Sequence, residues 1–398
     1  MATPNFWGSG PPQSRRACAA VAFALLLVLS IWGLSPASAV GPYPALGSCS
    51  VFPQPLASLS PRAPSLPTEA AWNQDISKAP RDPRSPAYIA YIDSHGGDRL
   101  HPDFGSPRPY GFPYSVVSAG QRRLPIHYTA YGDESDPGPF PVPAKAPVEG
   151  GNGSDGDRHV LVVDRSACKL YELYRAFYVA KGLRRSPRVR LADAGPSGGR
   201  TQGGRIAPLF GRLRTPPREV CPAPPSVRGG CDAGPQPRPH WNADSGTEWD
   251  LRSAARRPEG WTSADAAGLP IFPGLVRYDE VAAGHLDHAI RVTFESTRNA
   301  WVHPASHCAG DTSNPAAPPM GLRLRLKAGY GLGGFSGPAK TIALAMKRYG
   351  LIIADNGSNW FFSGSSDRRW DDENLDQLKR IPGRAFEVVK SAASVHSC

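Results

Sequence analysis

The sequence predicts a mainly β protein with a β-sandwich or jelly-roll-like core, one or two short helices and long Pro/Gly-rich loops. The 398 residues include 44 Pro and 42 Gly. Both residue types interrupt helices, which argues against a helical bundle or a coiled coil. The chain also contains many short runs of strand type bounded by turn residues. Its 9 Trp, 13 Tyr and 14 Phe are ample for a packed core.

The first 39 residues have the pattern of a secretory signal peptide. A pair of arginines precedes the apolar run 17–34, and Ala37-Ser38-Ala39 offers small residues for cleavage. The alternative is a single membrane anchor, but no basic cluster follows the run. We therefore expect a secreted, extracellular chain beginning at Val40. No later stretch reaches the roughly 20 apolar residues that span a bilayer.

Cysteine usage agrees with export. Six cysteines follow the signal, and an even number in an exported chain suggests disulfides. Cys221 and Cys231 are the close pair and are expected to bond to each other. No C-x-x-C occurs, so neither a zinc ribbon nor a thioredoxin-like site is expected.

After a flexible Pro/Ser-rich lead-in at 40–71, residues 72–398 are expected to form a single β-rich domain. Strong apolar or alternating runs predict strands at Tyr114–Val117, Ile126–Tyr131, His159–Asp164, Lys169–Tyr174, Gly274–Glu280, His288–Phe294, Gly321–Lys327, Leu351–Ala354, Trp360–Ser363 and Phe386–Val389. The short turn between His159–Asp164 and Lys169–Tyr174 predicts a β-hairpin. Two helices are expected, Pro338–Tyr349 with Gly350 as its C-cap and the shorter Asp372–Lys379.

Positive charge is concentrated in residues 181–240. This segment holds 12 Lys or Arg and 3 Asp or Glu, within a formal net charge of +11 for the whole chain. It also holds 21 Gly and Pro and has no apolar periodicity. We interpret it as a basic, solvated insertion closed by Cys221–Cys231. The alternative is adhesion to an anionic polymer, such as an acidic polysaccharide, a teichoic acid or nucleic acid.

Ionisable residues are densest in the loop-rich stretch 261–291. A glycoside hydrolase needs two carboxyl groups flanking the scissile bond, and Asp265 and Glu280 are the leading pair. Asp355, which follows an apolar run, is the third carboxylate, and His288 is the supporting imidazole. The structural alternative is strong, because an Asp in a turn usually caps its own backbone.

Aromatic and basic residues near these carboxylates are candidates for substrate binding. An indole can stack on a sugar ring while guanidinium groups hold its hydroxyls. On this basis we select Trp261, Trp360, Arg277 and Arg291, although most tryptophans belong to a core.

Other chemistries have weaker support. His285, His288 and His307 would serve a metal-assisted hydrolase, but no H-E-x-x-H spacing occurs, so no metal is expected. No G-x-S-x-G is present. The Gly-rich piece 329–334 lacks the Lys-Ser/Thr ending of a P-loop, so neither a nucleotide nor another cofactor is expected.

Several long motifs resemble those of a family of secreted bacterial hypothetical proteins. They are DESDPGPFPVP (133–143), TSADAAGLPIFPGLVRYDE (262–280), HAIRVT (288–293), PPMGLRLRLKA (318–328) and ADNGSNWFFSG (354–364). The resemblance implies one continuous β-rich unit from Trp72 to about Val389. It also implies that 181–240 is a peripheral expansion. The resemblance implies no particular activity and identifies no catalytic residue.

Together these observations lead us to expect a secreted protein that acts on extracellular polysaccharide or cell-wall glycan. Our first hypothesis is a glycoside hydrolase with paired carboxylates. The alternative is a non-catalytic carbohydrate-binding or cell-envelope surface protein.

Overall fold

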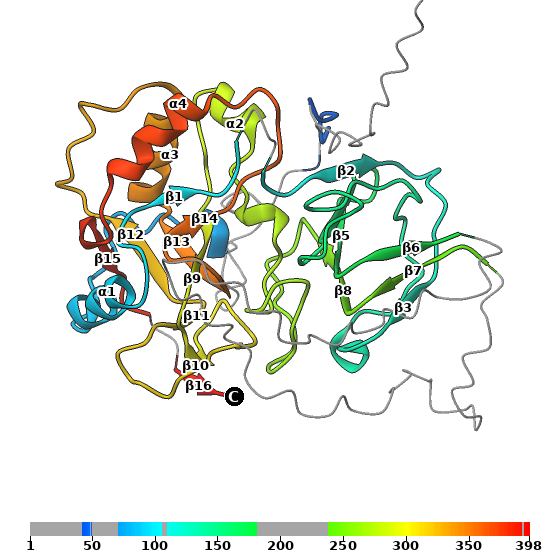
Figure 1. Cartoon of the computed structure of the whole chain (residues 1–398), viewed down its shortest axis with the longest axis horizontal. Helices are drawn as coiled ribbons and strands as arrows, with labels where there is room; N and C mark the ends of the chain where they lie inside the picture. Colours follow the sequence, from blue (N-terminus) through cyan, green and yellow to red (C-terminus); the bar gives the residue numbers. More distant parts are fainter. Residues whose placement is uncertain (1–41, 48, 50–70, 106–109, 181–237, 392–393) are drawn as a thin grey trace, which may run out of the picture. The chain divides into compact units, whose positions relative to one another are not determined.

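Strand residues outnumber helical residues in the part of the chain that the computed structural model describes. That part comprises residues 42–47, 49, 71–105, 110–180, 238–391 and 394–398 (Figure 1). The mainly β class is therefore confirmed. The strands pair into several sheets, and a sandwich or jelly roll is not confirmed.

The largest sheet of the described residues has six strands and mixes parallel with antiparallel pairs. Its spatial order is β1 (His101–Pro102), β14 (Phe361–Phe362), β9 (Ile290–Phe294), β13 (Leu351–Asn356), β12 (Arg323–Leu326) and β15 (Phe386–Val388). The parallel β9–β13 pair lies at its centre. Along β12 the leucines are buried and the arginines are half-buried, which confirms the alternation read from the sequence.

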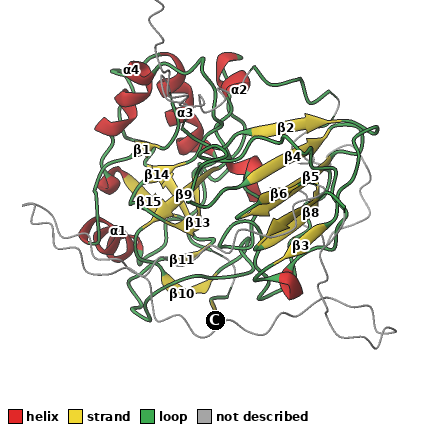
Figure 2. Ribbon diagram, turned by 45° about the vertical axis from the view of Figure 1, so that its right-hand side comes forward, coloured by secondary structure: helices red, strands yellow, loops and turns green. Residues whose placement is uncertain are grey.

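The remaining described strands form three smaller sheets, and the labelled strands of two of them lie at the right of Figure 2. One contains β2 (Tyr114–Val117), β4 (Val160–Asp164), β5 (Lys169–Tyr174) and β8 (Ser245–Asp250). The second contains β3 (Ile126–Tyr128), β7 (His240–Ala243) and β6 (Phe177–Val179), and the third β11 (Pro319–Met320), β10 (Arg298–Trp301) and β16 (His396–Ser397). Strands β4 and β5 pair antiparallel, which confirms the expected hairpin.

Helix α3 (Gly337–Arg348) agrees with its prediction and contacts β12 of the six-stranded sheet. Its buried side chains include Ile342 and Met346, which join the main core cluster. Gly350 follows with φ +75°, a left-handed conformation that suits glycine and ends the helix. The predicted 372–379 helix is present as α4 (Asp372–Leu375), which continues as a 3₁₀ turn.

Two helices were not predicted. Helix α1 (Ser85–Ser94) begins with a proline in its first turn, and its buried tyrosines and isoleucines lie within a stretch that reads as turn-rich. Helix α2 (Tyr278–Ala282) occupies the place of the strand predicted at 274–280, so that prediction is wrong. A seven-residue run is too short for its periodicity to separate strand from helix. The described 3₁₀ turns are Ala71–Asn73, Gly132–Glu134, Phe272–Gly274, Asp376–Arg380 and Gly383–Ala385.

Several sequence predictions lie outside the described residues. These are the signal peptide, most of the lead-in, nearly all of the basic insertion and the Cys221–Cys231 pair. Among the described helices, none combines the length and the hydropathy that a membrane span requires. Cys308 and Cys398 lie at disulfide-forming distance, with Cα atoms 6.5 Å apart, so one cysteine pair of an expected disulfide framework is present.

Candidate active site

The guanidinium of Arg291, on β9, is the centre of a buried polar cluster. Its Nε donates to Asp265 Oδ2 at 2.9 Å, and its Nη2 donates to Asp265 Oδ1 at 2.7 Å. The same Nη2 donates to Asp355 Oδ2 at 2.6 Å, and Nη1 donates to Ser363 Oγ at 2.9 Å. Arg291 is 3% exposed. A charge so deeply buried requires this complete set of partners.

A register shift in the central strand pair brings Asp355 to this cluster. On β13, Ile352 pairs with Arg291 and Ile353 with Val292 of β9. The next pair joins Asp355 to Thr293, so Ala354 is skipped. Without that shift Asp355 would lie on the opposite face of the sheet, because side chains alternate along a strand. The bulge therefore turns the Asp355 carboxyl toward Arg291.

Asp265 comes from the loop that joins β8 to α2. Its backbone N–H donates to Ser263 Oγ at 2.9 Å, and the Ser263 hydroxyl in turn donates to Leu269 O at 2.6 Å. These local bonds hold a turn whose carboxylate faces inward. Asp265 is 1% exposed and both its oxygens bond to Arg291. We therefore assign it a positioning role, since it does not reach solvent.

An imidazole–carboxylate pair adjoins the same loop. His159 Nδ1 is hydrogen-bonded to Glu149 Oε2, and His159 Nε2 faces Ala264 O at 2.9 Å. With an acceptor at each nitrogen, the ring carries both protons. Burial opposes this charge, but the Glu149 carboxylate outweighs it and raises the pKa of His159 to about 9. Neither residue was predicted from the sequence to belong to the site.

The two carboxyl groups at the border of the cluster have pKa values shifted in opposite directions. Burial raises the pKa of Asp355 to about 7, with the Asp265 charge adding to the shift and the Arg291 charge opposing it. Burial acts in the same sense on Glu149, but the positive charges of His159 and Arg291 overcome it and lower its pKa. The side chains of Asp355 and Glu149 are 23% and 25% exposed, so both reach solvent.

The separation of Asp265 and Asp355 is limited by the nitrogen they share. Each has an oxygen within 2.7 Å of Arg291 Nη2, so these two oxygens are separated by at most twice that distance. Burial of Asp265 leaves Asp355 as the member of this pair that a substrate can reach.

Glu280, the other half of the predicted pair, belongs to a different group of side chains. It forms an ion pair with Arg277 and faces His288 Nε2 at 3.3 Å, while His288 Nδ1 bonds to Ala289 O. Burial favours protonation, but the charges of Arg277 and His288 lower the pKa of Glu280. The contacts of Asp265 and Glu280 are therefore separate, and the predicted pair does not form one hydrogen-bonded unit.

The two selected tryptophans differ in accessibility. Trp360 is fully buried, its Nε1 donates to Asp93 Oδ1 at 2.8 Å, and its ring packs edge-on against Phe294. Its ring therefore has no exposed face for a sugar. Trp261 is half-buried, with the Arg257 guanidinium 5.4 Å from its ring centre.

The histidines considered for metal chemistry have separate partners. His285 pairs with Asp287 at 3.0 Å on an exposed loop. His288 faces Glu280, and His307 Nδ1 bonds to Ala266 O at 2.7 Å. Among the described residues these three histidines do not gather around one point.

Glu172, on β5, is a further buried carboxyl that sequence analysis did not select. It accepts the backbone N–H groups of Ile271 and Phe272, each at 2.9 Å, and so anchors the loop that carries Asp265. Burial raises its pKa to about 7 against the effect of those hydrogen bonds. The sequence pattern could have identified this buried position, because Glu172 lies two residues after Leu170 in an alternating strand and therefore on the same face.

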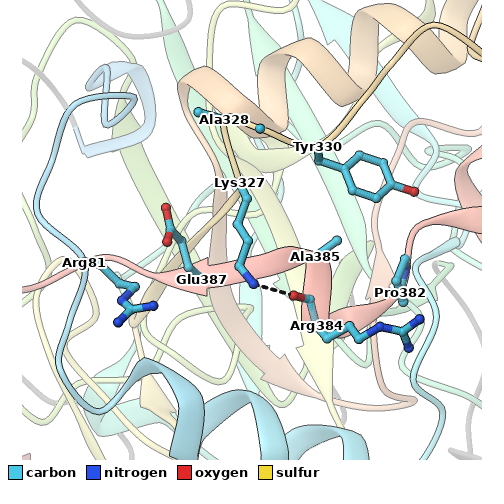
Figure 3. Close-up of a pocket in the computed structure, with 9 residues that line it drawn as sticks. Arg81, Lys327, Ala328, Tyr330, Pro382, Arg384, Ala385 and Glu387 are labelled. Carbon is cyan, nitrogen blue, oxygen red and sulfur yellow. Dashed lines mark hydrogen bonds between the residues drawn. The ribbon is translucent and has the colours of Figure 1, made fainter.

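A shallow groove of about 710 Å³ gathers charge elsewhere on the surface (Figure 3). Arg81, Lys327 and Arg384 line it together with Tyr330, and Lys327 Nζ donates to the Arg384 carbonyl at 2.8 Å. The basic side chains are exposed. No residue of the Arg291 cluster lines this groove.

Comparison of this chain with protein-family models, with curated proteins and with solved structures found no match.

Proposed function

We propose that this protein hydrolyses glycosidic bonds in an extracellular polysaccharide, with Asp355 as the general acid and Glu149 as the base or nucleophile. The assignment is supported by two solvent-reaching carboxyl groups, Asp355 hydrogen-bonded to Arg291 and Glu149 hydrogen-bonded to His159, whose pKa values are shifted in opposite directions. Glycosidases need one carboxyl that is protonated at working pH and one that is ionised. The proposal keeps the reaction class expected from the sequence but assigns it to a different pair of carboxyl groups.

Each group has a defined task in this mechanism. Asp355 donates its proton to the glycosidic oxygen as the bond to the anomeric carbon breaks. Glu149 either attacks that carbon or removes a proton from the attacking water, according to the carboxyl separation in the complex. Arg291 compensates the charge left on Asp355 after proton transfer, and Asp265 holds Arg291 in place.

The residues around His159 support the role proposed for Glu149. His159 keeps Glu149 ionised and fixes one of its oxygens, which leaves the second oxygen for the reacting atom. The half-buried ring of Tyr174 lies 5.4 Å from the His159 ring. We assign it to the sugar-binding surface in place of Trp360.

The experiment is reducing-sugar release from a panel of plant, fungal and bacterial polysaccharides. Wild-type protein is compared with Asp355→Asn, Glu149→Gln and the control Asp98→Asn, an exposed aspartate whose side chain pairs with its neighbour Arg99. We expect release by wild type and by the control, and a loss of about 10²–10⁴-fold in each site variant. Release that persists in both site variants would overturn the assignment.

A non-catalytic carbohydrate-binding role is the second candidate. The groove of Figure 3 favours it, because Tyr330 and three basic side chains form a shallow face suited to an extended polymer. Absence of release on every polymer, with retention of one polymer in a pull-down that Tyr330→Ala abolishes, would select this role.

A further inference from the structure

Glu259, His303 and His396 converge from three separate segments of the chain. Their ligand atoms all lie within 4.8 Å of one another, the one such group found among the described residues. We propose that these three side chains bind a divalent transition-metal ion of the zinc class. The proposal concerns a site that shares no residue with the Arg291 cluster.

The geometry already brings two ligands together. His303 Nε2 lies 2.7 Å from Glu259 Oε1, and Trp301 Nε1 donates to the other oxygen, Oε2, at 3.2 Å. The indole therefore orients the carboxylate and leaves Oε1 directed at the histidine. Such outer hydrogen bonds to a ligand are a regular feature of metal centres.

The third ligand is positioned by the C-terminal strand. His396, on β16, pairs with Trp301 on β10, and its ring stacks on the indole with centroids 5.2 Å apart. The His396 ring also lies 5.1 Å from that of His303. Cys398 follows two residues later at disulfide-forming distance from Cys308, which ties this strand to the body of the protein.

The donor set selects the class of ion. Two imidazole nitrogens and one carboxylate oxygen suit Zn²⁺, whereas Ca²⁺ and Mg²⁺ prefer shells made of oxygen. The side chains of His303 and Glu259 are 30% and 48% exposed, so a water molecule has access to a fourth position. To bind the ion through Nε2, His303 adopts the Nδ1–H tautomer, and the ion replaces its hydrogen bond to Glu259.

One neighbouring charge opposes the ion. Arg256 Nη1 lies 3.5 Å from the same Glu259 oxygen, and this exposed ion pair competes for it. Removing Arg256 leaves all three ligands in place and removes the competitor. Metal affinity should therefore rise in Arg256→Ala, which an accidental surface site on one histidine would not show.

The experiment measures Zn²⁺ binding to the purified, oxidised protein in competition with a chromophoric chelator. We expect one ion per chain, and a loss of more than about 100-fold in affinity in His303→Ala and His396→Ala. Trp301→Phe, which removes the orienting N–H together with part of the indole that stacks on His396, should lose about 10-fold. The control is His285→Ala, whose imidazole pairs with Asp287 on an exposed loop outside the site.

The spectrum of the Co²⁺-substituted protein gives a second readout. Intense visible bands are expected for a four-coordinate ion, and they should be absent in His396→Ala. Circular dichroism confirms that each variant is folded. The proposal is overturned by stoichiometric binding that survives both histidine substitutions, by equal losses in His285→Ala, or by the absence of binding at micromolar Zn²⁺.

Discussion

Arg291 and Asp265 form a two-point ion pair in the interior of the protein, with Nε donating to Oδ2 at 2.9 Å and Nη2 to Oδ1 at 2.7 Å. The side chains are 4% and 0% exposed. Removing either partner of such an ion pair destabilises the folded state, because the remaining partner would be an uncompensated buried charge.

We therefore predict that Arg291→Ala lowers the free energy of unfolding by about 3–5 kcal/mol. Arg291→Lys should recover only part of this loss, since an ammonium cannot bridge both Asp265 oxygens and Ser363. The control is Arg252→Ala. Arg252 makes a similar two-point contact with Asp250, but its side chain is 61% exposed, and its loss should cost no more than about 1 kcal/mol. Urea unfolding measures both, and equal losses would contradict the prediction.

The proposed catalytic pair predicts a bell-shaped dependence of kcat/KM on pH. Asp355 must be protonated, and burial raises its pKa to about 7, so activity should fall above that pH. Glu149 must be ionised, and the charges of His159 and Arg291 overcome burial to lower its pKa, so the acid limb should lie below about pH 4.5. An alkaline limb that keeps its position in a weakly active Asp355→Asn protein would assign the acid to another residue.

Stability should be greatest on the mildly acidic side of neutrality. Burial raises the pKa of Glu172 and that of Asp355 to about 7 each, so the folded state holds more protons than the unfolded state between about pH 4.5 and 7. The free energy of unfolding consequently falls as pH rises through that window. Glu149 and Glu280 act in the opposite direction, because their pKa values are lowered in the folded protein. The stabilisation that they contribute to the folded state is therefore lost as the pH falls further.

Glu172→Gln isolates one contribution to this profile. It should flatten the decline between pH 4.5 and 7 by on the order of 2–3 kcal/mol, because the amide cannot ionise. Thermal unfolding across the pH range provides the measurement, with the exposed Glu295→Gln as control. A decline that is equally steep in both variants would show that Glu172 does not ionise in this window.

The structure holds Cys308 and Cys398 at disulfide-forming distance and Cys49 and Cys168 as buried free thiols, and we predict that both pairs form disulfides in the oxidised protein. Cys308 and Cys398 have Cα atoms 6.5 Å apart. The buried Cys49 thiol is in hydrogen-bond contact with Cys168, and burial together with that neighbour raises the pKa of Cys49 to about 12. Mass spectrometry of unreduced peptides should recover both pairs. Cys398→Ser should cost about 2–4 kcal/mol of stability. Recovery of Cys49 or Cys168 as an alkylated free thiol would refute the second pair.

The sequence by itself determined the elements with strong local patterns. The β4–β5 hairpin, the alternating β12 and helix α3 with Gly350 after it could all be recognised, because side-chain period and capping are local properties. It also identified Asp265, Arg291 and Asp355 as candidates. Helix α2 was missed because a few residues of mixed pattern do not distinguish strand from helix.

Tertiary structure alone decided which of these candidates meet. The contacts of Arg291 reach Asp265 and Asp355, 26 and 64 residues away, and His159 reaches Ala264 across 105. Such contacts depend on strand order and register, and a one-residue bulge decides the face on which Asp355 lies. Burial and neighbouring charge then separate the protonation states of Asp355 and Glu149, and neither quantity exists before the chain has packed.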